Sequence, residues 1–270
     1  MKRLIVVMAA LVVLAASCNE YVVTLDPRYT ATDTFQVAVD TTGRDRVAIQ
    51  GINGNIRVTG VAGAASISIS AVIRVEADSQ EEAENHLFDV LVEVDTIAPS
   101  PEAVEISTVH RFVDPEGRNY SVDYEVTMPA EMAVTVINVN GNCAVDSIAP
   151  DTNEAVYINL TNGNACAVDI MGSTVVNVVN GNICGKVALS GQQWIEMSTV
   201  NGMIDLDIPR STSAMLDATA IRGGVYVRYL DVLYIERSKF HILGRLGDGV
   251  GSIELDVTNG PIWVSGIGAP

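Results

Sequence analysis

Six Asn-Gly pairs recur along the chain, and their spacing constrains the fold more than any other feature. They stand at Asn53-Gly54, Asn140-Gly141, Asn162-Gly163, Asn180-Gly181, Asn201-Gly202 and Asn259-Gly260, and Arg222-Gly223 takes the same place once. From Gly141 to Gly223 the copies are 22, 18, 21 and 21 residues apart. Because Asn and Gly tolerate a positive φ, each pair predicts a sharp corner in an internally repeated structure.

The flanks of each pair alternate between apolar and polar residues. Counting back from Asn162 by two, four and six gives Leu160, Ile158 and Val156, and most other copies follow the same rule. The alternation continues after the corner glycine and predicts a half-buried strand on either side of it. Two inward positions depart from the pattern, because Asn138 is polar and Gly185 has no side chain.

Two architectures satisfy this pattern. Asn-Gly is the strongest short signal for a β-hairpin, and the parity of the flanking residues is the same in a hairpin and in a solenoid. Near-constant spacing favours the solenoid, in which equivalent residues stack from coil to coil about 4.8 Å apart. We therefore predict an all-β fold, a single-domain β-solenoid resembling a right-handed β-helix, over residues 35–270. The corner asparagines are expected to form a hydrogen-bonded ladder.

A longer excursion separates the first two Asn-Gly pairs. The alternation over Ser66–Ala77 predicts a strand. Ser79-Gln80-Glu81-Glu82 is a capping-box pattern that opens a short helix, which should cover an open end or face of the β structure. The expected buried face of this helix holds Ala83, Leu87, Val90 and Leu91. Val104–Val113 and Tyr120–Met128 read as paired strands around a turn at 114–117.

The N-terminus reads as a secretory leader over residues 1–17. Lys2 and Arg3 precede a 13-residue apolar run, Leu4–Ala16, which is too short to cross a bilayer of about 30 Å. Small residues stand directly before Cys18, as in a lipobox, so we predict lipidation of Cys18 and a tether over residues 18–34. The alternative is ordinary signal-peptidase cleavage with Cys18 as a free thiol.

Charge excludes one class of partner. The chain has 16 basic and 33 acidic residues, a net charge of −17, and loses two more positive charges with the leader. So negative a surface repels nucleic acid phosphates and anionic lipid. We expect no nucleic acid partner, and membrane contact only through the N-terminal lipid.

Cys166 and Cys184 both fall three residues after a corner glycine, on the outer face of neighbouring coils. Strands about 4.8 Å apart place such Cα atoms within disulfide range, so we predict a Cys166–Cys184 bridge. A rival interpretation starts from Cys143-Ala-Val-Asp146, which recurs at residues 166–169. It would point Cys166 inward after a one-residue bulge.

Motifs for chemistry are weak. No Cys-x-x-Cys pair, Gly-x-Ser-x-Gly elbow or calcium repeat occurs in the sequence, and Gly247–Gly251 lacks the Lys-Ser/Thr of a P-loop. The outer positions three residues after each corner glycine include one carboxylate, Asp205. We predict no catalytic residue, no metal site and no cofactor. Trp194 and Trp263 count as outward, where they would contact a partner or glycan, or be covered by the helix or a loop.

Several segments resemble the bacterial putative-adhesin, or toastrack, family, over roughly residues 35–268. They are Val47–Val58, Glu81–Ala83, Ser121–Pro129 and Leu246–Val264, together with the successive Asn-Gly coils. The resemblance implies a β-solenoid domain at the cell envelope with no established active site.

We therefore expect a non-catalytic envelope lipoprotein that acts as an interaction or assembly scaffold in adhesion or envelope stress. Its partner would be an envelope protein or glycan. Because Asn19, not aspartate, follows Cys18, the outer membrane is favoured. The alternative is a polysaccharide-active enzyme on a β-helix, which would need paired carboxylates along a groove.

Overall fold

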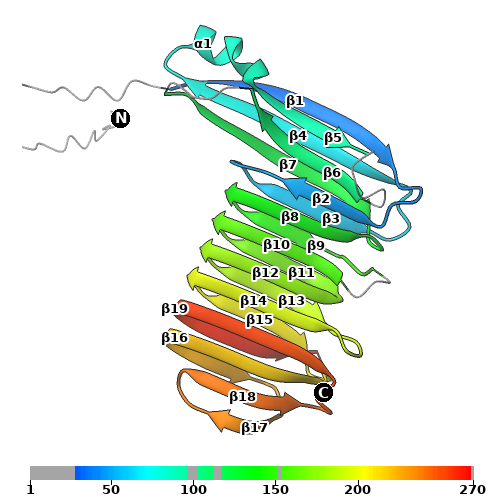
Figure 1. Ribbon diagram of the computed structural model, residues 1–270, viewed down its shortest axis with the longest axis vertical. Helices are drawn as coiled ribbons and strands as arrows, with labels where there is room; N and C mark the ends of the chain where they lie inside the picture. Colours follow the sequence, from blue (N-terminus) through cyan, green and yellow to red (C-terminus); the bar gives the residue numbers. More distant parts are fainter. Residues whose placement is uncertain (1–27, 97–102, 112–116, 151–153, 269–270) are drawn as a thin grey trace, which may run out of the picture.

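A computed structural model describes residues 28–96, 103–111, 117–150 and 154–268. The chain winds into one tall stack of coils, with strands running across the stack and a short helix at one end (Figure 1). The leader, Cys18 and the first part of the expected tether lie outside the described residues. The helices of the described part include none long and apolar enough to cross a membrane.

The elements alternate from one side of the stack to the other. In chain order they are β1 Tyr29–Asp40, β2 Arg46–Gln50, β3 Ile56–Val61, β4 Ser66–Ala77, α1 Gln80–Asn85, the 3₁₀ turn η1 Leu87–Asp89, β5 Val90–Asp95, β6 Ala103–His110, β7 Asn119–Pro129, β8 Ala133–Asn140, β9 Cys143–Asp146, β10 Glu154–Asn162, β11 Ala165–Met171, β12 Ser173–Asn180, β13 Ile183–Ala188, β14 Trp194–Asn201, β15 Ile204–Pro209, β16 Ala214–Arg228, β17 Val232–Arg237, β18 His241–Leu246 and β19 Gly251–Ile267.

Strands before the corners form a first sheet and strands after them a second. In the first sheet β8, β10, β12 and β14 pair in parallel, and in the second β9, β11, β13 and β15 do the same. The two halves of β16 and β19 belong to both sheets, because these strands run through the corner. Parallel pairing between coils confirms the solenoid and excludes the hairpin alternative, in which β8 and β9 would be antiparallel partners.

The first and last coils of the sequence are not the ends of the stack. β2 lies between β6 and β8, and β3 lies between β7 and β9. Likewise β19 lies between the β14/β15 coil and β16. Figure 1 shows this as blue strands among green ones and a red strand between yellow and orange. The first and the last Asn-Gly coil of the sequence are therefore each held by a neighbouring coil on either side, whereas β1 pairs with β4 alone among the described strands.

Close approach of successive corners explains the glycines. Gly163 has φ +132°, and a Cβ atom built on it would collide with the carbonyl oxygen of Gly141 in the preceding corner. The same collision would occur at most other corner glycines, including Gly202, whose φ is not positive. Glycine is thus required by space as well as by backbone conformation.

The corner asparagines form the expected ladder. Each amide nitrogen donates to the side-chain oxygen of the Asn in the preceding coil, at 2.7–2.9 Å, through the series Asn53, Asn140, Asn162, Asn180, Asn201 and Asn259. The series follows the order of coils in space rather than in sequence, since Asn259 donates to Asn201. Asn53 ends the ladder by donating to the carbonyl oxygen of Tyr120.

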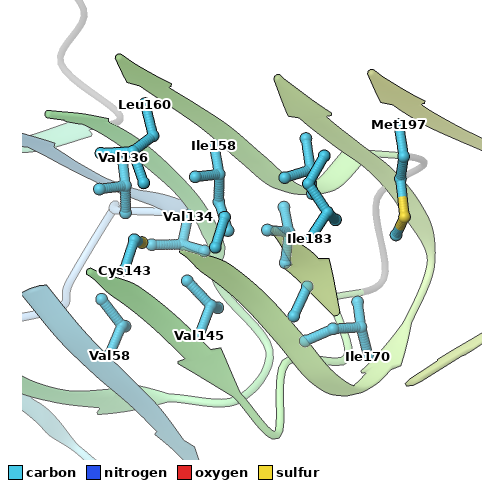
Figure 2. Close-up of a cluster of buried hydrophobic side chains, with 14 of the residues drawn as sticks. Val58, Val134, Val136, Cys143, Val145, Ile158, Leu160, Ile170, Ile183 and Met197 are labelled. Carbon is cyan, nitrogen blue, oxygen red and sulfur yellow. The ribbon is translucent and has the colours of Figure 1, made fainter. Parts of the chain in front are cut away.

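The core lies between the two sheets, and the residues expected to face inward fill it. Leu160, Ile158 and Val136 from the first sheet point toward Val145 and Val58 from the second (Figure 2). Burial of each such side chain contributes about 1.5–3 kcal/mol. This periodic core runs the length of the stack and belongs to one continuous cluster.

Both exceptions to the inward pattern have a physical explanation. Asn138 is buried, and its amide donates to the carbonyl oxygens of Gly54, at 2.9 Å, and of Asn140. A Cβ atom on Gly185 would collide with the side-chain end of Met197, which occupies the missing volume. One polar residue therefore satisfies a corner carbonyl, and one glycine makes room for a long neighbour.

At the end of the stack that carries α1, the cap and the buried Ala83 of the helix are as expected, but the length of the helix is not. Ser79 caps α1 by accepting from the backbone N–H of Glu82 at 3.1 Å, and the buried Ala83 packs against Ala31 of β1 and Ala77 of β4. The helix is shorter than expected, because residues 90 and 91 already belong to β5.

Two further expectations about this end are wrong. The segment 29–34, which was expected to be part of the tether, belongs to β1 and pairs with β4. Its alternating threonines suit a strand, but Ala31 is the one buried apolar residue in it, so little in the sequence indicated a strand there. The strands β6 and β7 are not partners of each other, since β6 pairs with β2 and β5 whereas β7 pairs with β3 and β4. They are the two halves of one coil.

Replacing Gly163 by alanine tests the close approach of corners. Gly63 is a matched control, because its φ is +70° and nothing lies within 4 Å of a Cβ atom built there. Gly63→Ala should lower the free energy of unfolding by about 1–2 kcal/mol, the cost of the left-handed backbone. Gly163→Ala should lower it by about 3 kcal/mol or more, because a collision is added. Equal losses in chemical denaturation would contradict the packing argument.

Candidate functional site

The corner amides are hydrogen-bonded to one another within the fold. A second ladder runs beside the first, in which Asn142, Asn164 and Met203 donate their backbone N–H groups to the asparagine side chain of the preceding coil. Its first member, Asn55, donates to Asp123, which also accepts from Arg74 at 2.9 Å. Burial alone would raise the pKa of Asp123, but the hydrogen bonds from Asn55 and Arg74 outweigh it and lower the pKa.

The outer strip of the second sheet is stacked in register. It runs through Arg57, Ala144, Cys166, Cys184, Asp205, Trp263 and Tyr226. At its far end Trp263 stacks on Tyr226 with ring centroids 4.2 Å apart, and the guanidinium of Arg228 lies 4.1 Å from the Trp263 centroid. Trp263 is thus covered by its own neighbours rather than by the helix or a loop.

Trp194 lies on the first sheet and borders a hollow in the outer face. The hollow has a volume of about 260 Å³ and is lined by Tyr157, Val175 and Arg46 as well. The backbone N–H of Trp194 donates to the Ser173 hydroxyl at 3.1 Å, which ties the start of β14 to β12. The two tryptophans are therefore on different sheets and do not form one site.

A group of carboxylates lies on the outer face of the first sheet. The outer positions three residues after each corner glycine, which the sequence pattern singled out, lie on the second sheet instead. Glu196, Glu254 and Asp217 are in register on three adjacent strands, and Asp256 follows on β19. Burial, and then the charges of Asp217 and Glu196, raise the pKa of Asp256. The alternation of β14, β16 and β19 placed these residues outward, but their pairing depends on β19 lying between the other two strands.

Cys166 and Cys184 both face outward, as the first of the two interpretations of the cysteines predicted. Cys166 and Cys184 are register partners on β11 and β13, with Cα atoms 4.6 Å apart and their sulfurs joined in a disulfide. Cys166 is not inward, because the extra residue of β11 comes later, after Ala167. Cys143 is a free thiol in the core, and burial raises its pKa to about 12.

Two of the three histidines, His86 and His241, lie within hydrogen-bond distance of carboxylates, and His110 lies near the ring of Tyr120. His86 Nδ1 lies 2.6 Å from Asp89, and the ring of His241 lies between Asp217 and Glu236, at 3.0 and 3.2 Å. Within the described ranges no group of three or more His, Cys, Asp or Glu side chains is arranged to hold a metal ion.

Comparison with known proteins identifies structural neighbours only. No family model matches the chain, and no curated protein does. A putative cell adhesion protein from Clostridium sporogenes superposes with a TM-score of 0.47 at 11% identity, covering 88% of this chain and 100% of the other. A putative adhesin from Bacteroides fragilis gives 0.28 at 10% identity, over 87% and 97% of the two chains. A putative lipid binding protein from Parabacteroides distasonis gives 0.25 at 10%, over 88% and 97%.

The names of the first two neighbours, a putative cell adhesion protein and a putative adhesin, agree with the resemblance in the sequence. With about one residue in ten identical, the likeness concerns the fold alone.

Thiol counting tests the cysteine arrangement. In a chain that starts at residue 18 and carries Cys18→Ser, no thiol should react at pH 8 in the native state, because Cys143 is buried and its pKa is raised to about 12. One thiol should react in denaturant without reductant. Since the bridge joins residues 18 positions apart, reduction should lower the free energy of unfolding by about 3 kcal/mol.

Cys143→Ala is the control and should leave no reactive thiol in denaturant. Three reactive thiols in unreduced, denatured protein that retains Cys143 would contradict the bridge.

Proposed function

We propose that the protein is a non-catalytic, lipid-anchored scaffold of the cell envelope that binds an envelope glycan or protein on the outer face of its solenoid. The observation that carries this proposal is the hollow beside Trp194. Tyr157 and Trp194 provide aromatic surface there, and the described lining residues include no carboxylate. Aromatic side chains beside a few polar groups suit recognition of a sugar ring or a peptide, while hydrolysis of a glycan requires two carboxyl groups.

A rigid support strengthens the argument. The floor of the hollow is the parallel first sheet, whose inward residues are fully buried and whose corners are joined by the asparagine ladder. A binding surface on regular strands is held more exactly in place than one on loops. The scaffold thus presents the hollow without a cost of ordering on binding.

Binding to envelope material tests the hollow. The chain starting at residue 18 with Cys18→Ser should bind immobilised envelope glycans or cross-link to an envelope protein. Trp194→Ala should weaken that binding at least tenfold, because ring contact contributes much of the affinity. Trp263→Ala is the matched control, since Trp263 is stacked within the second sheet, and it should bind like the unmodified chain. Equal binding by both variants would exclude the hollow as the site.

The anchor is tested separately in cells. Growth with an alkyne-tagged fatty acid should label the full-length protein and leave it with the outer-membrane fraction. Cys18→Ala should abolish the label and release the protein, because acyl chains contribute about 0.8 kcal/mol per buried CH₂. Labelled protein that carries Cys18→Ala would contradict lipidation at this residue.

One observation favours the alternative, a polysaccharide-active enzyme. Asp256 has a raised pKa beside other carboxylates, which is a property of general acids in glycosidases. None of these carboxylates is among the described lining residues of the hollow, although Glu196 lies two residues from Trp194 on the same outer face of β14. Shortening of a polysaccharide by the protein, lost in Asp256→Asn, would favour the enzyme over the scaffold.

A further inference from the structure

The end of the stack opposite α1 carries an unusual group of side chains. The hairpin of β17 and β18 closes this end (Figure 1), and β17 has no strand partner but β18 in the described part of the chain. We call the tip surface the set Tyr229, Leu233, Ile235, Arg237, Lys239 and Phe240. Tyr229 is 71% exposed, Leu233 and Ile235 are each 61% exposed, and Phe240 is 46% exposed. Single exposed apolar residues are ordinary, but a group of them marks an interaction surface.

Cations accompany these apolar residues. The Arg237 guanidinium lies 4.6 Å from the ring centroid of Tyr234, and the Lys239 ammonium lies 5.0 Å from that of Phe240. Arg210 approaches Tyr229 in the same manner, at 5.7 Å. The cationic groups therefore lie beside the exposed rings and not in a separate patch.

The local charge is opposite to that of the whole chain. Residues 210–246 include six basic and three acidic residues, in a chain whose net charge is −17. Two of the three acids, Asp217 and Glu236, are the partners of His241. Charges beyond a Debye length of about 8 Å are screened at physiological salt, so an anionic partner at the tip is affected mainly by the tip itself. The charge near the tip is therefore less negative than that of the whole chain, although Asp217 of the carboxylate group lies on β16, two strands from β17.

The form of β17 argues against addition of a strand from another protein. The strand has six residues, a bulge interrupts its register between Tyr234 and Glu236, and Arg237 and Lys239 stand at its end. Short length, bulges and basic side chains are the features by which proteins prevent edge pairing. A glycan would leave the aliphatic side chains of Leu233 and Ile235 without a partner.

A bilayer surface accommodates all three kinds of side chain. Aliphatic groups enter the boundary of the acyl chains, aromatic rings lie at the level of the headgroups, and Lys and Arg meet lipid phosphates. We propose that the tip surface docks on a bilayer rich in anionic phospholipid. This docking does not depend on lipidation of Cys18, whose tether joins the chain at the opposite end of the stack.

Vesicle binding by acyl-free protein tests the proposal. The chain starting at residue 18 with Cys18→Ser is incubated with vesicles of phosphatidylglycerol and phosphatidylcholine in equal parts, or of phosphatidylcholine alone, and sedimented. Protein should sediment with the mixed vesicles at least tenfold more strongly than with the neutral ones, and less at high salt. The double variants Arg237→Glu/Lys239→Glu and Leu233→Asp/Ile235→Asp should each lose at least tenfold of that binding.

Matched controls lie elsewhere on the stack. Arg57→Glu changes an exposed arginine of the second sheet, and Val200→Asp changes a valine that is 42% exposed beside a corner. Both should bind like the unmodified chain. Far-ultraviolet circular dichroism shows whether each variant is folded, and the charge variant tests the proposal if the apolar one does not fold.

Three results would overturn the proposal. The first is equal binding to both vesicle types, and the second is undiminished binding by the charge variant. The third is self-association without vesicles that the tip variants abolish, which would assign the tip to contact between copies of the chain. Because no acyl chain is present, each result leaves the lipid anchor and the Trp194 hollow to their own tests.

Discussion

Close contact between backbone corners is the constraint on which the structure depends. Successive coils can stack at strand spacing on both sheets only if the corners between them also approach to backbone distance. A glycine without a Cβ atom makes that approach feasible at Gly141, Gly163 and Gly181. The adjacent asparagine amides then satisfy one another along the stack, so that exposed polar groups contribute to its cohesion instead of competing for other partners.

The corners also decide where function can be located. Inward side chains are buried in the core, and the corner amides are hydrogen-bonded to one another. The side chains that remain for contact with other molecules lie mainly on the outer faces of the strands and at the ends of the stack. Within the described chain these regions differ in chemistry. The first sheet holds an aromatic hollow and a carboxylate group, and the second holds a disulfide and a stacked aromatic pair. The end formed by β17 and β18 is basic and apolar. A single solenoid thus presents several separate surfaces.

Local patterns predicted the repeated part of the chain well. Strict alternation around each Asn-Gly pair identified the inward residues. The equal distance of Cys166 and Cys184 from their corner glycines predicted that these two residues are neighbours. The limits of β1 and the pairing of β6 and β7 were missed for a physical reason. Thr30, Thr32 and Thr34 fill an exposed face without an apolar signal, and the partners of β6 are far away in the sequence.

Candidate sites were harder to predict than strands. That Trp194 and Trp263 face outward followed from counting residues, but their surroundings did not. Tyr226 reaches Trp263 only because β19 returns to lie beside β16, and the same return brings Glu254 between Glu196 and Asp217. Order along the stack differs from order along the chain at both ends, and no periodic pattern encodes that difference.

The position of β19 has a consequence for how the molecule is made. Its residues are synthesised after those of β14, β15 and β16, yet they lie inside the stack, with β14 and β15 on one side and β16 on the other. Until they arrive, β16 and the hairpin that follows it have no parallel neighbour to join them to the growing stack. β16 and its hairpin can therefore join the stack only after β19 has been synthesised and has paired with β14 and β15.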